Sequence, residues 1–304
     1  MKKRQVKDMA ASVHQRLLDK SRQTARPFNE LLQYYAMERF LYRLSRSAYA
    51  DKFVLKGAVM LTVWKAPVSR PTRDMDFLGR MNNDLGAIAD AVRNVCFTEV
   101  GPDGLEFNPE TIEAERIDED ADYEGVRVHF QGSLGNARIS MQFDVGFGDK
   151  VVPRARMIQY PTIIEMPAPV LTGYSMESMI AEKFEAMAKL GPLNSRMKDF
   201  FDIWLLSRLY EFNGETLVSA ISSTFKARST DISQYSSVFS AEFTADESKA
   251  KQWEAFLRRT AIESAPSQFS AVVGQISIFL GPPAEAVADG TPFAKSWTSG
   301  GPWQ

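Results

Sequence analysis

A β-hairpin pattern in the middle of the chain constrains the fold more than any other feature of the sequence. The runs GVRVHF (125–130) and ARISMQFDVGF (137–147) flank QGSLGN (131–136), whose Gly and Asn residues are typical of a hairpin turn. Alternate residues of a strand share a face. One face of the second run therefore holds Ile139, Met141, Phe143 and Val145, and the other holds Arg138, Ser140, Gln142 and Asp144. The pattern predicts a sheet with a core face and a polar face, with Asp144 on the polar one.

Helical periodicity is expected on both sides of this sheet. Before it, the spacing of apolar residues predicts helices at 5–20, 28–48 and 84–96, with Asn29 able to cap the second, and short strands at 53–57 and 72–78. A segment with three prolines, 160–175, marks a transition. Helices are predicted beyond it at 175–191, 196–212, 214–226, 246–260 and 267–280. We divide the chain into an amino-terminal domain (1–165), a helical domain (166–288) and a flexible tail (289–304).

Charge is distributed unevenly along the 304 residues. Residues 1–80 contain 17 Lys/Arg and 7 Asp/Glu, a balance of +10; the remaining 224 contain 19 and 31, a balance of −12, and the two sum to −2. A basic amino-terminal quarter can provide a positive surface for phosphates. Ordinary solvated helix faces explain the same excess, so both interpretations stay open.

Several classes of protein are disfavoured by composition. The single cysteine, Cys96, excludes an internal disulfide framework, and two histidines, His14 and His129, make a zinc site or a histidine-based triad improbable. No apolar run of about 18 residues and no apolar core in the charged first 20 residues are present, so we expect a cytoplasmic chain without a signal peptide or membrane span. Neither a P-loop motif nor a Gly-x-Ser-x-Gly motif is present.

Asp74 and Asp76 form an Asp-x-Asp triplet in VSRPTRDMDF (68–77). On a strand both carboxylates project to the same side, where they repel each other unless a cation compensates them. Mg²⁺ is the natural ion, because it takes oxygen ligands and leaves positions open for substrate phosphates. The alternative is an exposed strand end whose acids make surface ion pairs with Arg70 and Arg73.

The residues upstream favour the metal interpretation. FVLKGAVML (53–61) predicts a strand that runs into Gly57, with a small residue and then a helix-like run after it. Glycine lets the backbone approach a phosphate, and the start of a helix offers free N–H groups. Strand, glycine, helix and then a strand with Asp-x-Asp is the layout of a nucleotidyltransferase active site. Asp144 fits the position of a third acid, and this assignment stays open.

A second acidic cluster, IDEDADYEG (117–125), fails as a calcium loop. Its Asp118, Asp120 and Asp122 alternate like the first ligands of such a loop. However, Tyr123 replaces the glycine of the sixth position and His129 replaces the glutamate of the twelfth. A solvated loop is predicted.

The helical half contains a second group of charged candidates. Lys183 lies on a helix between Glu182 and Glu185, where it is either a functional cation or one charge of a mixed surface. Asp199 and Asp202 are three residues apart, so they share a helical face among aromatic residues. Acids in such surroundings need a cation partner. Lys198 or Arg196 could supply that cation in a purely structural arrangement, and a functional role for the two acids stays equally open.

Four segments, in order, resemble the motifs of the AbiEii/AbiGii family of nucleotidyltransferase toxins, within the DNA polymerase β-like superfamily. They are FVLKGAVML (53–61), SRPTRDMDF (69–77), MIAEKFEAM (179–187) and RMKDFFDIW (196–204). The resemblance covers about 50 to 210, and the family usually has Gly-Gly or Gly-Ser in place of Gly57-Ala58. It implies an α/β (α+β) fold class: a nucleotidyltransferase-fold mixed sheet flanked by helices, with a mainly helical carboxyl-terminal domain.

The resemblance also implies roles for particular residues. Nucleotide binding is implied for Lys56, Gly57, Ser69, Arg70, Thr72 and Arg73. Catalytic roles are implied for Asp74, Asp76, Lys183, Asp199 and Asp202. Binding of Mg²⁺ or Mn²⁺ is implied for Asp74 and Asp76, with Asp144 as the third ligand.

The function implied is that of a toxin in a toxin–antitoxin or phage-defence module. Family members transfer nucleotides from a nucleoside triphosphate to RNA, in some cases the 3′ end of tRNA, which stops translation. The implied partners are RNA, with tRNA as the expected substrate, and a cognate antitoxin protein; a monomer without membrane contact is expected. Two alternatives remain: a small molecule or protein hydroxyl as the acceptor, and a binding module with a degenerate site.

Overall fold

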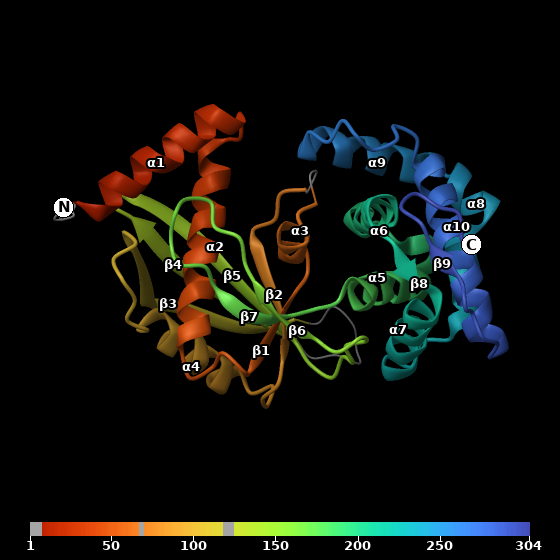
Figure 1. Ribbon diagram of the computed structural model, residues 1–304, viewed down its shortest axis with the longest axis horizontal. Helices are drawn as coiled ribbons and strands as arrows, with labels where there is room; N and C mark the ends of the chain where they lie inside the picture. The colour runs from red at the N-terminus through yellow and green to blue at the C-terminus, as the bar shows by residue number, and fades with distance from the viewer. Residues whose placement is uncertain (1–7, 67–69, 118–124) are drawn as a thin grey trace. The chain divides into compact units, whose positions relative to one another are not determined.

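The computed structural model describes residues 8–66, 70–117 and 125–304, which form two compact units (Figure 1). Unit 1 comprises Met1–Lys65, Pro71–Gly148 and Arg156–Gly173. Unit 2 comprises Ala66–Arg70, Asp149–Ala155 and Tyr174–Gln304. The two units are interleaved along the chain, and the boundary expected between residues 165 and 166 remains a prediction.

Unit 1 is built on a seven-stranded mixed sheet of order β3-β4-β5-β2-β1-β7-β6. The strands are β1 (Phe53–Lys56), β2 (Asp74–Gly79), β3 (Leu105–Ile117), β4 (Gly125–Leu134), β5 (Ala137–Gly146), β6 (Arg156–Gln159) and β7 (Val170–Gly173). β2 is central: it pairs in parallel with β5 and antiparallel with β1. The Asp-x-Asp triplet therefore lies in the interior of the sheet.

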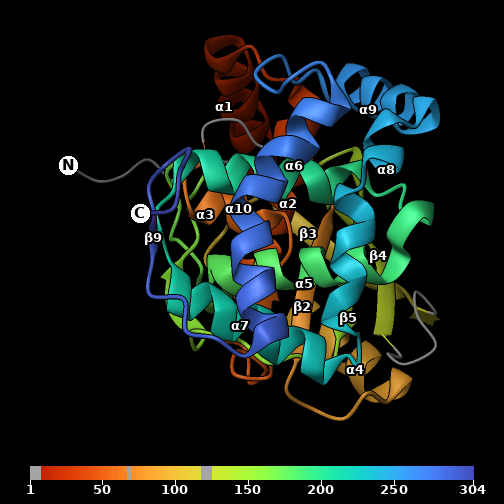
Figure 2. The ribbon, with the colours of Figure 1, turned by 90° about the vertical axis from the view of Figure 1, so that its right-hand side faces the viewer.

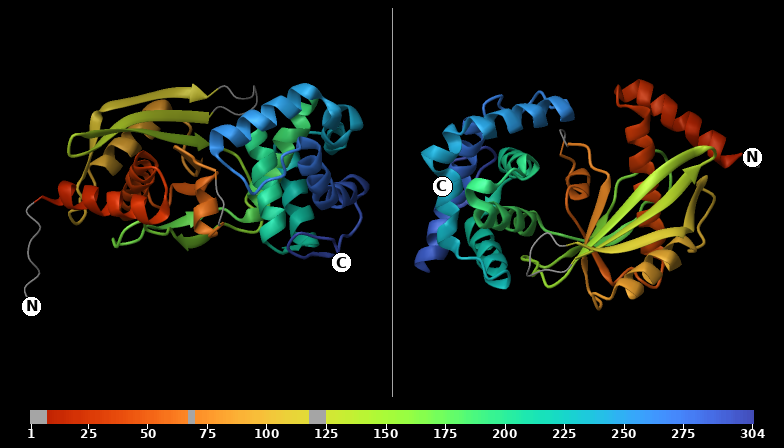
Figure 3. Two further views of the ribbon diagram at one scale, coloured as in Figure 1. Left: turned by 90° about the horizontal axis from the view of Figure 1, so that it is seen from above. Right: turned by 180° about the vertical axis from the view of Figure 1, so that it is seen from behind.

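One face of this sheet is covered by helices and forms the core of unit 1 (Figure 3). The helices of unit 1 are α1 (Met9–Thr24), α2 (Phe28–Arg46), α3 (Val59–Val63) and α4 (Leu85–Cys96). Phe40 of α2 packs on the rings of Phe107, Phe130 and Phe143, each from a different strand. The other face carries the polar residues of the strands, so apolar burial fixes which side of the sheet is available for chemistry.

The central hairpin confirms the predicted alternation but not the predicted turn. Ile139, Met141, Phe143 and Val145 are all buried. However, β4 continues to Leu134, so the turn consists of Gly135 and Asn136 rather than of residues 131–136. Gly135 has φ +56°, a backbone conformation that suits glycine. The shorter turn changes which residues face each other across the hairpin.

Unit 2 is mainly helical, which together with the mixed sheet confirms the predicted fold class. Its helices are α5 (Met176–Leu190), α6 (Met197–Leu209), α7 (Gly214–Ala227), α8 (Ala241–Ala245), α9 (Glu247–Thr260) and α10 (Phe269–Asp289), with 3₁₀ turns η1 (Gly191–Leu193) and η2 (Ile232–Phe239). Ser175 caps α5 by accepting a hydrogen bond from the Ser178 N–H at 3.2 Å. α10 packs across α6 and α7 (Figure 2).

Helix ends differ from the predictions by a few residues. α1 begins at Met9, where the Asp8 side chain caps it, and ends at Thr24 rather than at residue 20. Pro27, and not Asn29, is the cap residue of α2. α10 continues to Asp289 through two prolines. Within the described parts of the chain, α10 alone has the length and apolar composition to cross a membrane, and half of its apolar window is buried inside the protein.

The end of the chain is packed, so the prediction of a loose tail at 289–304 is wrong. Strand β9 (Ser296–Trp297) pairs with β8 (Phe212–Asn213). Trp297 is 3% exposed, and its indole N–H donates to the Ser207 carbonyl at 2.7 Å. The Trp303 ring stacks on Phe279. Composition predicted flexibility, but the tryptophans supply the buried area that holds the segment in place.

Candidate functional site

Asp74 and Asp76 lie on one face of β2, as the alternation predicts. Both side chains are half-buried, whereas Met75 and Phe77 between and after them are fully buried in the core on the opposite face. Because β2 lies between β1 and β5, both acids project from the middle of the sheet. The polar face of unit 1 therefore presents two adjacent carboxylates.

Gly57 makes room for one of these carboxylates. It comes directly after β1 and has φ +71°. The preceding residue, Lys56, ends β1 and is the register partner of Asp76 on β2. A Cβ atom on residue 57 would lie 1.9 Å from Oδ2 of Asp76 and 2.8 Å from Asp76 Cβ. No side chain fits there, so glycine is required both by the backbone conformation and by the position of the Asp76 carboxylate. The helix after it, α3, has only five residues.

Asp144 is in register with Asp76 but is already engaged. Its Oδ1 accepts from the Arg127 Nε at 3.0 Å, and its Oδ2 accepts from the Arg127 Nη2 at 2.7 Å and from the Gln142 Nε2 at 2.9 Å. Within residues 8–66, 70–117 and 125–304, no group of three His, Cys, Asp or Glu side chains is placed to hold a metal ion. The role of Asp144 as a metal ligand stays a prediction.

Asp74 and Asp76 are the other two candidate ligands, and their carboxylates suit a divalent cation. Asp74 and Asp76 offer oxygen donors from one strand face, and the absent Cβ of Gly57 leaves the space beside Asp76 to its carboxylate. Mg²⁺ binds through one or two protein carboxylates and completes its coordination with water and substrate phosphates. The donor set of unit 1 matches that requirement.

The segment that enters β2 is tied to α2. The Thr72 N–H donates to the Tyr34 hydroxyl at 3.1 Å, and Thr72 is buried, whereas Arg73 is exposed. Ser69, predicted to bind nucleotide, lies outside the described residues. Tyr34 was not predicted from the sequence, because nothing in the helical pattern of residues 28–48 indicates which tyrosine reaches the motif.

Unit 2 contains a compact ionic cluster around Lys183, on α5. The Lys183 ammonium lies 2.5 Å from Oδ1 of Asp199 and 2.9 Å from Oδ2 of Asp202, both on α6. Arg70 donates to both oxygens of Asp202, at 3.0 and 2.9 Å. The Arg196 Nε lies 3.0 Å from Oδ2 of Asp199. The structure thus brings four predicted site residues together and confirms Arg196 as a structural cation partner of Asp199.

The cluster carries net positive charge. Three cations surround two carboxylates whose side chains are 2% and 0% exposed, which gives a formal sum of +1. Burial raises the pKa of Asp199, but Lys183 and Arg196 outweigh burial and lower it. Burial lowers the pKa of Lys183, but the two carboxylates outweigh burial and raise it. Lys183 and Asp199 therefore keep their charges at neutral pH, and the formal excess of cations suits a polyanion such as a triphosphate.

The predicted site residues thus fall into two groups. Unit 1 holds Lys56, Gly57, Thr72, Arg73, Asp74, Asp76 and Asp144, and unit 2 holds Arg70, Lys183, Asp199 and Asp202. The first group offers carboxylates for a cation, and the second offers cations for an anion. Hydrogen bonds hold Thr72 and Asp144 in place in unit 1, and ion pairs hold the four residues of unit 2 together.

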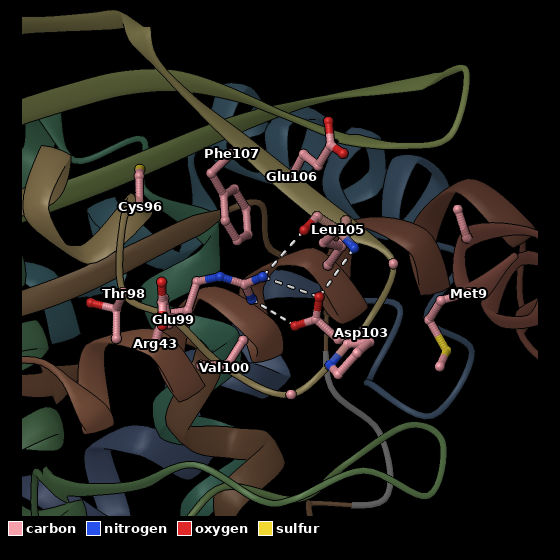
Figure 4. A pocket seen from close by; sticks show the side chains of 14 residues that line it. Met9, Arg43, Cys96, Thr98, Glu99, Val100, Asp103, Leu105, Glu106 and Phe107 are labelled. Carbon is pink, nitrogen blue, oxygen red and sulfur yellow. Dashed lines mark hydrogen bonds and ion pairs between the residues drawn. The ribbon is translucent and has the colours of Figure 1, made fainter. Parts of the chain in front are cut away.

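A pocket of unit 1 contains none of these residues (Figure 4). It has a volume of about 540 Å³ and lies between the start of α1, the end of α4 and the start of β3. The Arg43 guanidinium makes a bidentate pair with Asp103 there, at 2.6 and 3.1 Å. Burial raises the pKa of the Cys96 thiol at its edge to about 12, so this cysteine is no nucleophile at neutral pH. The charges of this pocket serve the structure of unit 1.

Comparison with known proteins gives one family and two related structures. The family model of the nucleotidyl transferase AbiEii toxin of type IV toxin–antitoxin systems matches residues 39–275. A crystal structure of a protein from H. pylori assigned as a nucleotidyltransferase has 14% identity and a TM-score of 0.45, over 86% of this chain and 98% of that one. JHP933 from Helicobacter pylori has 16% identity and a TM-score of 0.47, over 86% and 92%. A search of curated proteins finds no match.

Proposed function

We propose that this chain, which belongs to the AbiEii family of nucleotidyl transferase toxins, transfers a nucleotide from a nucleoside triphosphate to the 3′ end of RNA, with tRNA as the expected substrate. Modification of the tRNA 3′ end blocks aminoacylation and so inhibits translation, which is the toxic effect that we expect. A type IV system also implies an antitoxin partner. The observation that carries the proposal is the Asp74–Asp76 pair beside Gly57, where only glycine leaves room for the Asp76 carboxylate.

In the proposed reaction, the 3′ oxygen of the RNA attacks the α-phosphorus of the nucleotide. The bond from the α-phosphorus to the bridging oxygen breaks, and pyrophosphate leaves with that electron pair, while the hydroxyl proton passes to water. Asp74 and Asp76 would hold a divalent cation and fix its place on the rigid sheet. When bound, the cation lowers the pKa of the hydroxyl and neutralises charge on the phosphates.

Lys183 is the proposed ligand of the departing pyrophosphate. Its pKa is raised by Asp199 and Asp202, so it keeps its charge throughout the turnover. The same carboxylates fix the ammonium in place, and Arg70 fixes Asp202 in turn. Preorganised charge stabilises the growing negative charge of the leaving group without a reorganisation step. Lys183 would therefore act by position and electrostatics.

Transfer to RNA is tested by incubating the purified protein with total RNA, Mg²⁺ and each α-labelled nucleoside triphosphate in turn. Asp76→Asn removes one proposed ligand and keeps the side-chain shape, and Asp51→Asn, at an exposed position of unit 1, is the matched control. We expect label in RNA with the wild type and the control, and none with Asp76→Asn. Periodate oxidation of the RNA beforehand should abolish labelling, because it destroys the 3′-terminal diol.

The acceptor is decided by where the label appears. The basic balance of residues 1–80 favours RNA, because Lys and Arg residues provide salt-dependent contact with phosphates. Absence of label in RNA with all four nucleotides would refute RNA transfer. Label on protein or on a small molecule, lost again in Asp76→Asn, would assign a different acceptor to the same site.

A further inference from the structure

A row of charged residues crosses the polar face of the unit 1 sheet. Register pairs connect Lys56 on β1 with Asp76 on β2, Asp76 with Asp144 on β5, and Asp144 with Arg127 on β4. Register partners on neighbouring strands lie about 5 Å apart, close enough for their side chains to interact. The row therefore has two adjacent carboxylates in its middle and one cation on each side of them, and it ends at Glu115 on β3, the register partner of Arg127.

Arg127 donates hydrogen bonds to both carboxylate oxygens of Asp144. Its Nε and Nη2 donate to Oδ1 and Oδ2 of Asp144 at 3.0 and 2.7 Å, the two-pronged geometry that makes guanidinium–carboxylate pairs strong. Gln142 donates to the same Oδ2 at 2.9 Å. The Asp144 side chain is only 12% exposed and that of Arg127 27%, so water screens the pair weakly. Arg127 thus orients the Asp144 carboxylate toward β4, and Gln142, on the same strand as Asp144, holds one of its oxygens.

The Arg127 guanidinium supplies a fixed positive charge beside the carboxylates, and this charge affects how many metal ions they can hold. The row Lys56, Asp76, Asp144, Arg127 and Glu115 sums formally to −1. Asp74, two residues before Asp76 on β2, brings the total to −2, and one divalent cation brings it to 0. A guanidinium does not lose its proton in proteins, so this positive charge is permanent. A metal ion shared by Asp76 and Asp144 would lie beside it and be repelled. Without Arg127 the total is −3, and Asp144 is released to join the ligands.

We propose that Arg127 withdraws Asp144 from the metal site, so that the divalent cation is bound through Asp74 and Asp76 and the guanidinium takes the place of a second cation. Arg127 is then a positioning residue: it fixes the direction of the Asp144 carboxylate and limits the number of ions. This inference rests on the proposed function in one respect, the presence of a divalent cation at Asp74 and Asp76.

The test measures binding of Mn²⁺ alone to the full chain, without nucleotide, by titration calorimetry and by the loss of the free-ion electron paramagnetic resonance signal. Wild type should bind one Mn²⁺, and Asp144→Asn should still bind one, with a Kd raised at most about tenfold, because the variant loses one nearby negative charge but no ligand. Asp76→Asn should abolish binding. Arg127→Met should lower the Kd at least about tenfold or add a second ion, and the double variant Arg127→Met/Asp144→Asn should return to the wild-type behaviour, because the gain requires the Asp144 carboxylate.

The outcome that overturns the proposal is an Asp144→Asn variant that loses Mn²⁺ as Asp76→Asn does, because Asp144 is then a ligand in the native chain. An Arg127→Met variant with unchanged Mn²⁺ binding, or a wild type that binds none, overturns it equally. Thermal unfolding checks each variant, and if Arg127→Met does not fold, the comparison of Asp144→Asn with Asp76→Asn decides alone. If Mn²⁺ binding follows these predictions but no nucleotide is transferred, the result counts against the proposed function only.

Discussion

Replacing Gly57 with alanine places a methyl group where the Asp76 carboxylate lies. The new Cβ would stand 1.9 Å from Oδ2, 2.6 Å from Cγ and 2.8 Å from Cβ of Asp76. Rotation of the carboxylate relieves the first overlap but not the last, because the Asp76 Cβ is fixed by its strand. The backbone of β1 or β2 must therefore shift, and the shift moves the proposed metal ligand itself.

The cost has two separable parts. Alanine at φ +71° costs about 1–2 kcal/mol of backbone energy, and an overpacked site costs about 1–3 kcal/mol more. A displacement of about 1 Å at a catalytic group lowers the rate about 100-fold. We therefore expect a loss of roughly 2–5 kcal/mol in the free energy of unfolding of unit 1 and a loss of about two orders of magnitude in nucleotide transfer.

Two other glycines provide controls for this variant. Gly290 has φ +63° and open space around its Cβ position, so Gly290→Ala carries the backbone cost without a clash. Gly101 has open space and no positive φ, so Gly101→Ala should be neutral. Urea unfolding gives the stabilities, and RNA labelling and Mn²⁺ titration give the function. A Gly57→Ala protein that transfers nucleotide and binds Mn²⁺ as well as Gly290→Ala would refute the argument that Gly57 makes room for Asp76.

Three further outcomes follow from buried groups. Lys183→Met leaves two buried carboxylates without their ammonium partner and should destabilise unit 2 by about 3–5 kcal/mol in urea unfolding, whereas Lys251→Met, at an exposed position, should not. Burial raises the pKa of Glu38 from 4.5 to about 7, so the folded chain holds a proton that the unfolded chain has lost. The free energy of unfolding should fall as pH rises from 4.5 to 7, by up to about 3 kcal/mol, and Glu38→Gln should remove this slope in urea titrations at several pH values. Trp297→Ala should cost about 3–5 kcal/mol, and an unchanged Tm would show that the end of the chain contributes no stability.

The sequence predicted the site better where the chemistry is local. Asp74 and Asp76 share a face because strand geometry has a period of two, and Asp199 and Asp202 share a face because helix geometry places residues three apart together. Both patterns can be recognised within one element. The sheet and the helices were predicted for the same reason, because alternation and helical periodicity are local signals that apolar burial then enforces. The fold class itself was implied by the resemblance of the four motifs.

Arg127 was missed because hairpin register depends on the exact turn. A turn spread over residues 131–136 centres the hairpin between 133 and 134 and puts position 123 opposite Asp144. The observed turn at Gly135 and Asn136 puts Arg127 there instead. A one-residue change of the turn centre shifts the facing position by two residues, so the partner of Asp144 could not be named from alternation alone. Long-range pairs such as Tyr34 with Thr72 have no sequence signal of any kind.

The interleaving of the two units has a consequence for how the protein is made. The chain passes from unit 1 to unit 2 and back, so that residues 66–70 and 149–155 belong with residues 174–304. On the ribosome, the sheet of unit 1 lacks β6 and β7 until residue 173 has been synthesised. Arg70 and Val152, from the two short early segments, wait for their partners Asp202 on α6 and Ser178 on α5. No single cut in the gene yields either unit whole. A premature stop before the final helices removes part of unit 2, which holds the Lys183 cluster, and therefore produces a chain without a complete transferase.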